Sequence, residues 1–184
     1  MPLPRLCQVG LLHCNEKLIA QGFDNFESNF ILGLCYEDQP DNEKALKHYQ
    51  KAVQFKSDNA TCLFHLALVE KAFNMDSLSM AHFNQSLEVS LPKGRALRTY
   101  KWLADLHFQH HRYADAARDF ELCILYDEED NPLNYYNAAQ MFIASKNKLK
   151  AKPYLQMFLA NANRLEDKKS AAQLISKAKE QLKQ

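Results

Sequence analysis

A ladder of small and large residues recurs four times along the chain, and this repetition limits the possible fold more than any other feature. The first copy consists of Gly33, Tyr36, Ala45, Tyr49 and Ala52. The small residue that opens the ladder returns after 34, 37 and 35 positions, and the later members shift in step with it. The later copies are Ala67, Glu70, Ser79, Phe83 and Ser86; Ala104, His107, Ala116, Phe120 and Cys123; and Ala139, Phe142, Ala151, Leu155 and Phe158. Each copy is therefore expected to be one structural unit.

The residues around the ladder predict helices. Apolar residues recur at i, i+3, i+4 and i+7 over long segments, strand-type alternation is missing, and the chain has only four glycines. Small residues at fixed places let two helices approach closely, and a large residue one turn later fills the remaining gap. Each copy is predicted to be a pair of antiparallel helices, and such a hairpin can bury its apolar face only by stacking on its neighbours.

This pattern resembles the tetratricopeptide repeat (TPR) family, whose unit is a helix–turn–helix of about 34 residues. The resemblance covers residues 26 to 164 and is closest in the first copy, at Leu32, Gly33, Tyr36, Ala45, Tyr49 and Ala52. Ser79 and Ser86 replace alanines of the family pattern, and Ser57 stands where the family has a helix-ending proline. The resemblance implies an all-α, right-handed superhelical solenoid of helix hairpins with capping helices at its ends.

We expect one domain over residues 1–184, made of about four repeats and two terminal segments. The N-terminal segment is either a natural capping helix or half of a repeat in a longer array. Pro153 predicts a late start or a kink in the second helix of the last repeat, because proline removes a backbone donor. The C-terminal segment should form a capping helix with its apolar stripe at Leu165, Ala172, Leu174, Ile175, Ala178 and Leu182. The predicted boundaries are 1–25, 26–59, 60–96, 97–131, 132–164 and 165–184.

Composition indicates a globular chain, and the sequence has no obvious targeting or membrane-spanning segment. Hydrophobic residues make up 47% and charged residues 24%, and no apolar run approaches the ~18 residues of a membrane span. The first residues make a poor signal peptide, so we expect a cytoplasmic location and no membrane insertion. An odd number of scattered cysteines, without a C-x-x-C motif, favours a reducing compartment and small core residues. They are Cys7, Cys14, Cys35, Cys62 and Cys123.

The two ends of the chain differ in charge. From Lys146 onward there are ten Lys/Arg and three Asp/Glu, a net of +7, whereas the preceding part has 13 basic and 19 acidic residues, a net of −6. A basic end can attract acidic partners or nucleic acid, or it can be the solvated back of a helix. Aromatic stacking groups are not interleaved with the lysines, so we expect no nucleic-acid binding. The acidic run at 127–130 is expected to cap the helix that begins near Pro132, with a binding role as the alternative.

Three histidines, His107, His110 and His111, fall at i, i+3 and i+4 and raise the question of a zinc site. In the repeat register, His107 lies where the family packs an aromatic residue between the two helices, and the other two fall in the turn. We therefore predict one packing imidazole, two solvated turn residues, and no metal or other cofactor.

The resemblance also indicates where a partner would bind. First helices of TPR proteins line a groove that takes an extended or helical peptide, and positions two, five, nine and twelve of each repeat face it. Carried over, the groove has an apolar strip and a polar centre beside Trp102, the only tryptophan. Phe30 and Phe64 could instead pack on a neighbouring helix. The candidate protein-binding residues are Phe30, Leu34, Phe64, Leu68, Arg98, Lys101, Trp102, Asp105, Tyr136 and Gln140.

These residues favour a non-catalytic scaffold that binds a peptide segment of another protein. Family members that clamp acidic chaperone tails need Lys and Asn where this chain has Phe30 and Leu34, so that clamp is not expected. The alternative is an export chaperone of the type III secretion kind, although the near-neutral charge and the fourth repeat depart from that pattern. No nucleophile, phosphate-binding or metalloprotease motif is present, so we expect no catalysis. The identity of the partner and the oligomeric state are left open.

Overall fold

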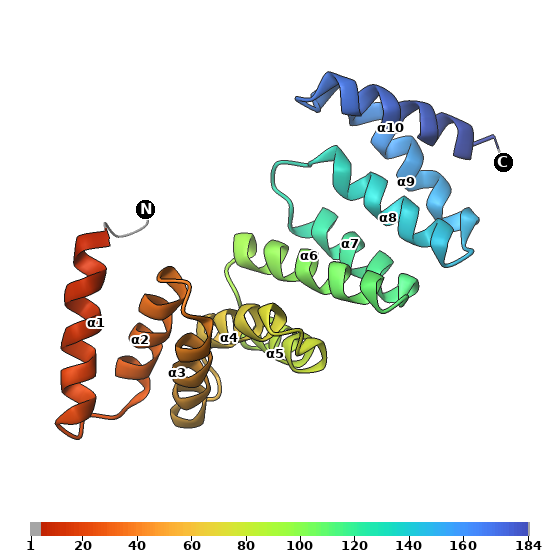
Figure 1. Cartoon of the computed structure of the whole chain (residues 1–184). Helices are drawn as coiled ribbons and strands as arrows, with labels where there is room; N and C mark the ends of the chain where they lie inside the picture. The colour runs from red at the N-terminus through yellow and green to blue at the C-terminus, as the bar shows by residue number, and fades with distance from the viewer. Residues whose placement is uncertain (1–4, 184) are drawn as a thin grey trace. The chain divides into compact units, whose positions relative to one another are not determined.

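The computed structural model describes residues 5–183, and they contain ten α-helices, one short 3₁₀-helix and no strand. The all-α prediction is confirmed. The helices follow one another as antiparallel hairpins, each joined by a short turn (Figure 1). The bounds are α1 Arg5–Ala20, α2 Phe26–Asp38, α3 Asn42–Phe55, α4 Ala60–Ala72, α5 Asp76–Val89, α6 Lys93–Gln109, α7 Tyr113–Tyr126, α8 Pro132–Ala144, α9 Lys148–Asn161, the 3₁₀-helix Ala162–Arg164 and α10 Lys168–Gln181.

The chain divides between Leu91 and Pro92 into two compact units. The first unit contains α1 to α5 and the second contains α6 to α10. The division falls in the short connection between α5 and α6. Pro92 is the N-cap residue of α6, and the helix begins at Lys93. This start lies four residues before the predicted repeat boundary at residue 97. Whether the chain acts as one domain stays a prediction.

The repeat ladder forms the core of each hairpin. Each of its members is buried except His107 and Phe120, which are half-buried. The two serines that replace alanines bond to nearby carbonyls: Ser79 Oγ donates to Ala67 O at 2.8 Å and Ser86 Oγ donates to Phe83 O at 2.7 Å. A buried hydroxyl with a partner costs little, so the ladder tolerates these departures from the family pattern.

In the first unit, side-chain caps set the helix starts and aromatic packing fills the core. Asn25 Oδ1 accepts from Ser28 N at the start of α2, and Asn59 Oδ1 accepts from Cys62 N at the start of α4, both at 2.9 Å. Such caps satisfy donors that the first turn leaves without partners. The core is formed by Leu32, Tyr36, Ala45, Tyr49, Ala52, Cys62, Leu66 and Val69. At the predicted N-terminal cap, Tyr36 Oη of α2 donates to Glu16 Oε1 of α1 at 2.6 Å.

In the second unit, two predicted helix starts need correction, while the alternative of a kink at Pro153 stays a prediction. The second helix of the last repeat, α9, does not start late, because Asn147 caps it and the helix continues from Lys148 through Pro153. Pro153 is exposed, and so is Leu149, the residue whose carbonyl loses its donor. The C-terminal helix begins at Lys168 and not at Leu165, because Asp167 caps it by accepting from Lys169 N and Ser170 N at 3.0 and 3.2 Å.

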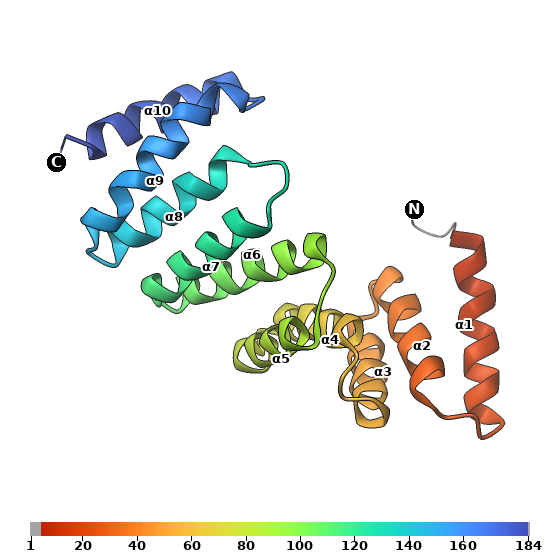
Figure 2. The same ribbon diagram turned by 180° about the vertical axis from the view of Figure 1, so that it is seen from behind.

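In the C-terminal helix, α10, the buried residue is Ala171 and not Ala172 as predicted. Ala171 and Ala178 are the buried residues of α10, while Ala172 is exposed. Leu165, Leu174, Ile175 and Leu182 pack against the core of the second unit as predicted. Figure 2 shows α10 from behind, beside α9. Within residues 5–183, no helix is long and apolar enough to cross a membrane.

Candidate protein-binding surfaces

A pair of facing side chains recurs inside each hairpin and contains three of the seven histidines. One member comes from the first helix and the other from the second, always 12 positions later. In the outer hairpins the pairs are stacked rings: Tyr36 with His48 at a centroid distance of 5.6 Å, and Phe142 with Tyr154 at 5.5 Å. The inner hairpins have acid–imidazole pairs in their place.

The acid and the histidine come in opposite order along the chain in the two acid–imidazole pairs. Glu70 of α4 is 1% exposed, and its Oε2 lies 2.7 Å from Nδ1 of His82 on α5. In the next hairpin the histidine comes first, and His107 Nδ1 lies 2.6 Å from Asp119 Oδ2. Burial raises the pKa of Asp119 to about 6, although the bond from His107 opposes this shift. The pairs join the two helices of a hairpin, and Glu70 and His82 also line a hollow of about 440 Å³ beside Leu66 and Leu78.

The histidine cluster is therefore divided between two environments. His107 lies between α6 and α7, as its place in the ladder predicted. His110 and His111 are exposed in the turn, where His111 has a positive φ of 57° and its Nδ1 lies 2.8 Å from Tyr113 Oη. In the part of the chain that the structure describes, no three His, Cys, Asp or Glu side chains lie close enough to hold a metal ion.

The acidic run before α8 makes contacts that order the loop, but the residue that caps α8 is Asn131, which lies outside the run. Asp127 accepts from Asn131 N at 3.1 Å and from Asn134 Nδ2 at 2.5 Å. Asp130 accepts from Tyr135 Oη at 2.5 Å and from Arg164 at 2.9 Å. Asn131 caps α8 by accepting from Leu133 N at 3.0 Å. These contacts order the loop and the start of α8.

Cysteine chemistry gives no support to a catalytic site. Cys35, Cys62 and Cys123 are buried and Cys14 is exposed, and none of these four forms a disulfide. Burial raises the pKa of Cys62 and of Cys123 to about 12, so both thiols are protonated at neutral pH. A protonated buried thiol is a packing group and a poor nucleophile.

In the first unit, the predicted groove residues form a surface that is mostly covered. Phe30, Leu34 and Leu68 are half-buried, and Phe30 stacks on Phe26 with centroids 5.6 Å apart. Phe64 is 1% exposed because its ring packs on Phe83, with centroids 5.9 Å apart, and against His65 at 5.4 Å. Phe64 thus supports the surface from beneath. The prediction that its side chain is exposed in the groove is wrong.

A hydrogen-bonded group anchors that same surface. Glu37 Oε2 accepts from Tyr49 Oη at 2.6 Å and lies 2.9 Å from His65 Nδ1. The Tyr49 and His65 rings stack with centroids 5.8 Å apart. Burial and the nearby carboxylate of Glu37 both raise the pKa of Tyr49, so its hydroxyl keeps its proton and donates. This group joins α2, α3 and α4 and holds their side chains in fixed positions.

In the second unit, the structure brings three predicted or neighbouring groove residues around one hollow of about 170 Å³. Lys101 is exposed, Asp105 is half-buried, and Phe108 is 47% exposed, all on α6. Phe120 of α7 and Asn137 and Met141 of α8 complete the walls. Arg98 is exposed and Trp102 is half-buried on the same helix. The hollow therefore combines an aromatic edge, a cation and a carboxylate within three turns of helix.

Two groove residues of α8 have other roles. Tyr136 is 7% exposed and packs on Phe158, with ring centroids 5.0 Å apart, so it belongs to the core. Gln140 exchanges two hydrogen bonds with Gln181 of α10, at 2.9 and 3.1 Å. A reciprocal amide pair of this kind fixes the terminal helix against α8. Neither side chain is presented as an open contact surface.

Stacked hairpins with a buried small residue at the same place in each first helix define a TPR-type helical fold. The chain is similar to MamA at 14% identity and a TM-score of 0.68, over 83% of this chain and 87% of that one. It is also similar to PilF of Pseudomonas aeruginosa, at 15% identity and a TM-score of 0.60, over 91% and 88% of the two chains.

A third neighbour is the C-terminal part of a TPR repeat-containing protein from Cytophaga hutchinsonii, at 14% identity and a TM-score of 0.65, over 83% of this chain and 59% of that one. No protein-family model and no curated protein matches the chain by sequence. The chain is TPR-like in fold, as the ladder predicted.

Proposed function

We propose that the chain is a non-catalytic protein-interaction scaffold that binds a peptide segment of a partner protein on the first helices of its hairpins. The observation that carries this proposal is the hollow formed by Lys101, Asp105 and Phe108. An aromatic side chain that is half exposed beside charged groups is typical of residues that anchor interfaces. The TPR-type fold supports a binding role, and the buried, protonated thiols of Cys62 and Cys123 act as packing groups.

The two kinds of side chain divide the work of recognition. Phe108 offers an apolar contact, and a backbone or side-chain donor of the peptide can bond to Asp105. Lys101 and Arg98 favour a segment that carries a carboxylate at one end. On the first unit, the half-buried Phe30, Leu34 and Leu68 would add apolar contacts. Phe64 and Tyr136 would act only by supporting the surface from beneath.

Co-purification with charge-reversed variants tests the proposal. We expect a partner to be retained by the wild-type chain and lost with Lys101→Glu and with Phe108→Glu. Leu125→Glu is the matched control, because Leu125 is 76% exposed on α7 and lies outside the hollow. Phe64 is unsuitable as a test position, since a charge there would disrupt the core. Equal retention by all three variants, each with the helical content of the wild type, would refute binding at the hollow.

A further inference from the structure

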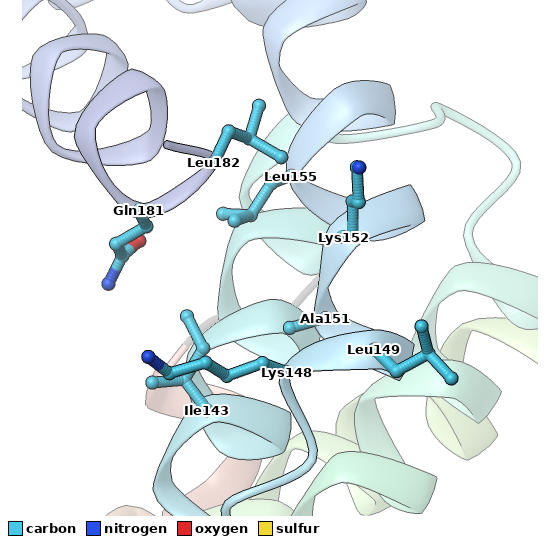
Figure 3. Close-up of a pocket in the computed structure, with 8 residues that line it drawn as sticks. All are labelled: Ile143, Lys148, Leu149, Ala151, Lys152, Leu155, Gln181 and Leu182. Carbon is cyan, nitrogen blue, oxygen red and sulfur yellow. The ribbon is translucent and has the colours of Figure 1, made fainter. Parts of the chain in front are cut away.

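A second cavity, of about 300 Å³, opens at the turn of the last hairpin (Figure 3). We call it the α9 pocket, and it is lined by Ile143, Lys148, Leu149, Ala151, Lys152, Leu155, Gln181 and Leu182. Figure 3 shows Leu155 of α9 and Leu182 from the end of α10 close together, with Lys148 and Lys152 at the edge. Ala151 and Leu155 are buried, and Ile143 and Leu182 are half-buried. The floor is apolar and the edge is cationic.

The charged side chains that line the α9 pocket are all positive. No Asp or Glu lines the pocket, and Gln181 is engaged by Gln140. Lys148 and Lys152 are exposed and, within residues 5–183, neither forms an ion pair. The segment that follows residue 145 carries the net charge of +7 that the sequence showed. An anionic partner is thus the electrostatic complement of this edge.

The start of α9 is also unfavourable for an isolated helix. Four helices have an acidic residue in the first turn, at Glu27, Glu43, Asp76 and Asp115, whereas α1, α4, α6, α8 and α10 have none. The first turn of α9 has none and begins with Lys148. Lysine near the positive end of the helix dipole is destabilising, and a bound carboxylate would relieve that repulsion.

We propose that the α9 pocket binds a segment of a partner protein in which one bulky apolar side chain is flanked by carboxylates. About 300 Å³ is at the lower end of ligand cavities and suits one or two side chains. Lys148 and Lys152 are four residues apart and so lie on one face of α9, about 5–6 Å apart at Cβ. Two cations beside one apolar floor match two carboxylates that flank an apolar residue, whereas a fatty acid offers a single carboxylate.

The site does not depend on the hollow around Lys101, because the two cavities share no lining residue.

Peptide selection tests the proposed ligand. Random peptides displayed on phage are selected on the immobilised wild-type chain and counter-selected on the Lys148→Glu/Lys152→Glu variant. We expect the enriched peptides to carry a bulky apolar residue between acidic residues. The consensus peptide is then synthesised with a fluorescent label, and its affinity is measured by anisotropy.

Matched variants separate this site from general attraction to a basic chain. Lys169→Glu/Lys177→Glu makes the same charge change at exposed positions of α10 that do not line the pocket. We expect the Lys148→Glu/Lys152→Glu variant to weaken the labelled peptide at least about tenfold, and the α10 variant to weaken it less than about twofold. Replacing the apolar residue of the peptide by Ala should also abolish binding, while Lys101→Glu in the protein should leave it unchanged.

Three results would overturn the proposal. One is that selection yields no peptide that distinguishes wild type from Lys148→Glu/Lys152→Glu. Another is that the two double variants weaken the peptide equally, or that Lys101→Glu removes binding and the pocket variant does not. The third is that no selected peptide binds but decanoate does, with its binding lost in the pocket variant, because the ligand is then a small amphiphile.

Discussion

Replacing Gly33 by alanine tests the packing on which the first hairpin depends. An ideal Cβ on Gly33 would lie 2.5 Å from Cδ1 and Cε1 of Tyr49 and 2.9 Å from its Cζ. Ordinary contact begins at 3.4 Å, so the ring would have to retreat by about 1 Å. Tyr49 is fully buried and its hydroxyl donates to Glu37 at 2.6 Å, which leaves it little freedom to move.

Two opposing effects set the magnitude. Overpacking of a rigid core costs about 1–3 kcal/mol, and here the nearest atoms belong to a fixed aromatic ring, so we take the upper end. Alanine gains about 1 kcal/mol over glycine through its higher helix propensity. Gly33→Ala should therefore lower the free energy of unfolding of the first unit by about 2 kcal/mol.

Urea unfolding followed by far-UV circular dichroism measures this loss, and the fluorescence of Trp102 reports separately on the second unit. Gly94→Ala is the control, because nothing lies within 4 Å of a Cβ built there. A rescue variant comes from the last hairpin, where Ala139 and Leu155 hold the places of Gly33 and Tyr49 in the ladder. In a Tyr49→Leu background only the helix-propensity gain should remain, so the further change Gly33→Ala should stabilise the first unit by about 1 kcal/mol. The coupling energy in the double-mutant cycle is then about 3 kcal/mol.

The reasoning fails if Gly33→Ala is as stable as the wild type or more stable, in the way that Gly94→Ala is expected to be. It fails as well if Gly33→Ala costs the same with Leu at position 49 as with Tyr. Either result would mean that the close approach of α2 and α3 at Gly33 does not depend on the missing Cβ.

Three further predictions concern the side-chain pairs. Because the pKa of Asp119 is raised from 3.8 to about 6 in the folded chain, the stability that its protonation provides is complete below about pH 4 and lost as pH rises through about 6. The loss is up to about 3 kcal/mol, and Asp119→Asn should flatten that interval of a urea-unfolding pH profile; an unchanged slope would contradict the assignment. His82→Ala leaves the buried Glu70 side chain without its imidazole partner and should cost about 2 kcal/mol by thermal unfolding, so a loss below about 1 kcal/mol would count against a contribution of this pair to stability. Gln181→Ala removes both amide bonds to α8, and amide exchange in α10 should speed up about tenfold while α8 keeps its protection.

Much of the fold could be predicted because the ladder depends on sterics within one hairpin. Gly33 and Tyr49, or Ala139 and Leu155, report the same close approach wherever they occur, and four copies make the period unmistakable. Helix boundaries were less accurate where capping decided them. Asp167 starts α10 three residues later than the hydrophobic stripe indicated, and a single capping carboxylate is a weak signal against a run of apolar residues.

The candidate surface was harder to predict because exposure depends on contacts between helices. Phe64 and Tyr136 hold groove positions in the repeat register, yet both are buried by rings from other helices, Phe83 and Phe158. A small rotation of a helix about its axis decides whether such a side chain is buried or exposed. The repeat register does not predict that rotation. The pair of Glu70 and His82 was missed, although the constant separation of 12 residues between facing partners was a signal present in every copy.

The central claim, that the hollow beside Lys101 binds a segment of another protein, is tested most directly by site-specific photo-crosslinking. A benzophenone amino acid is placed at position 108, at the edge of the hollow, and at position 125 as an exposed control, and the adducts formed in cells are digested and sequenced by mass spectrometry. We expect position 108 to capture one recurring peptide segment of one protein, Lys101→Glu to remove this adduct, and position 125 not to capture the segment. Adducts that are the same from both positions, or that Lys101→Glu leaves unchanged, would contradict it.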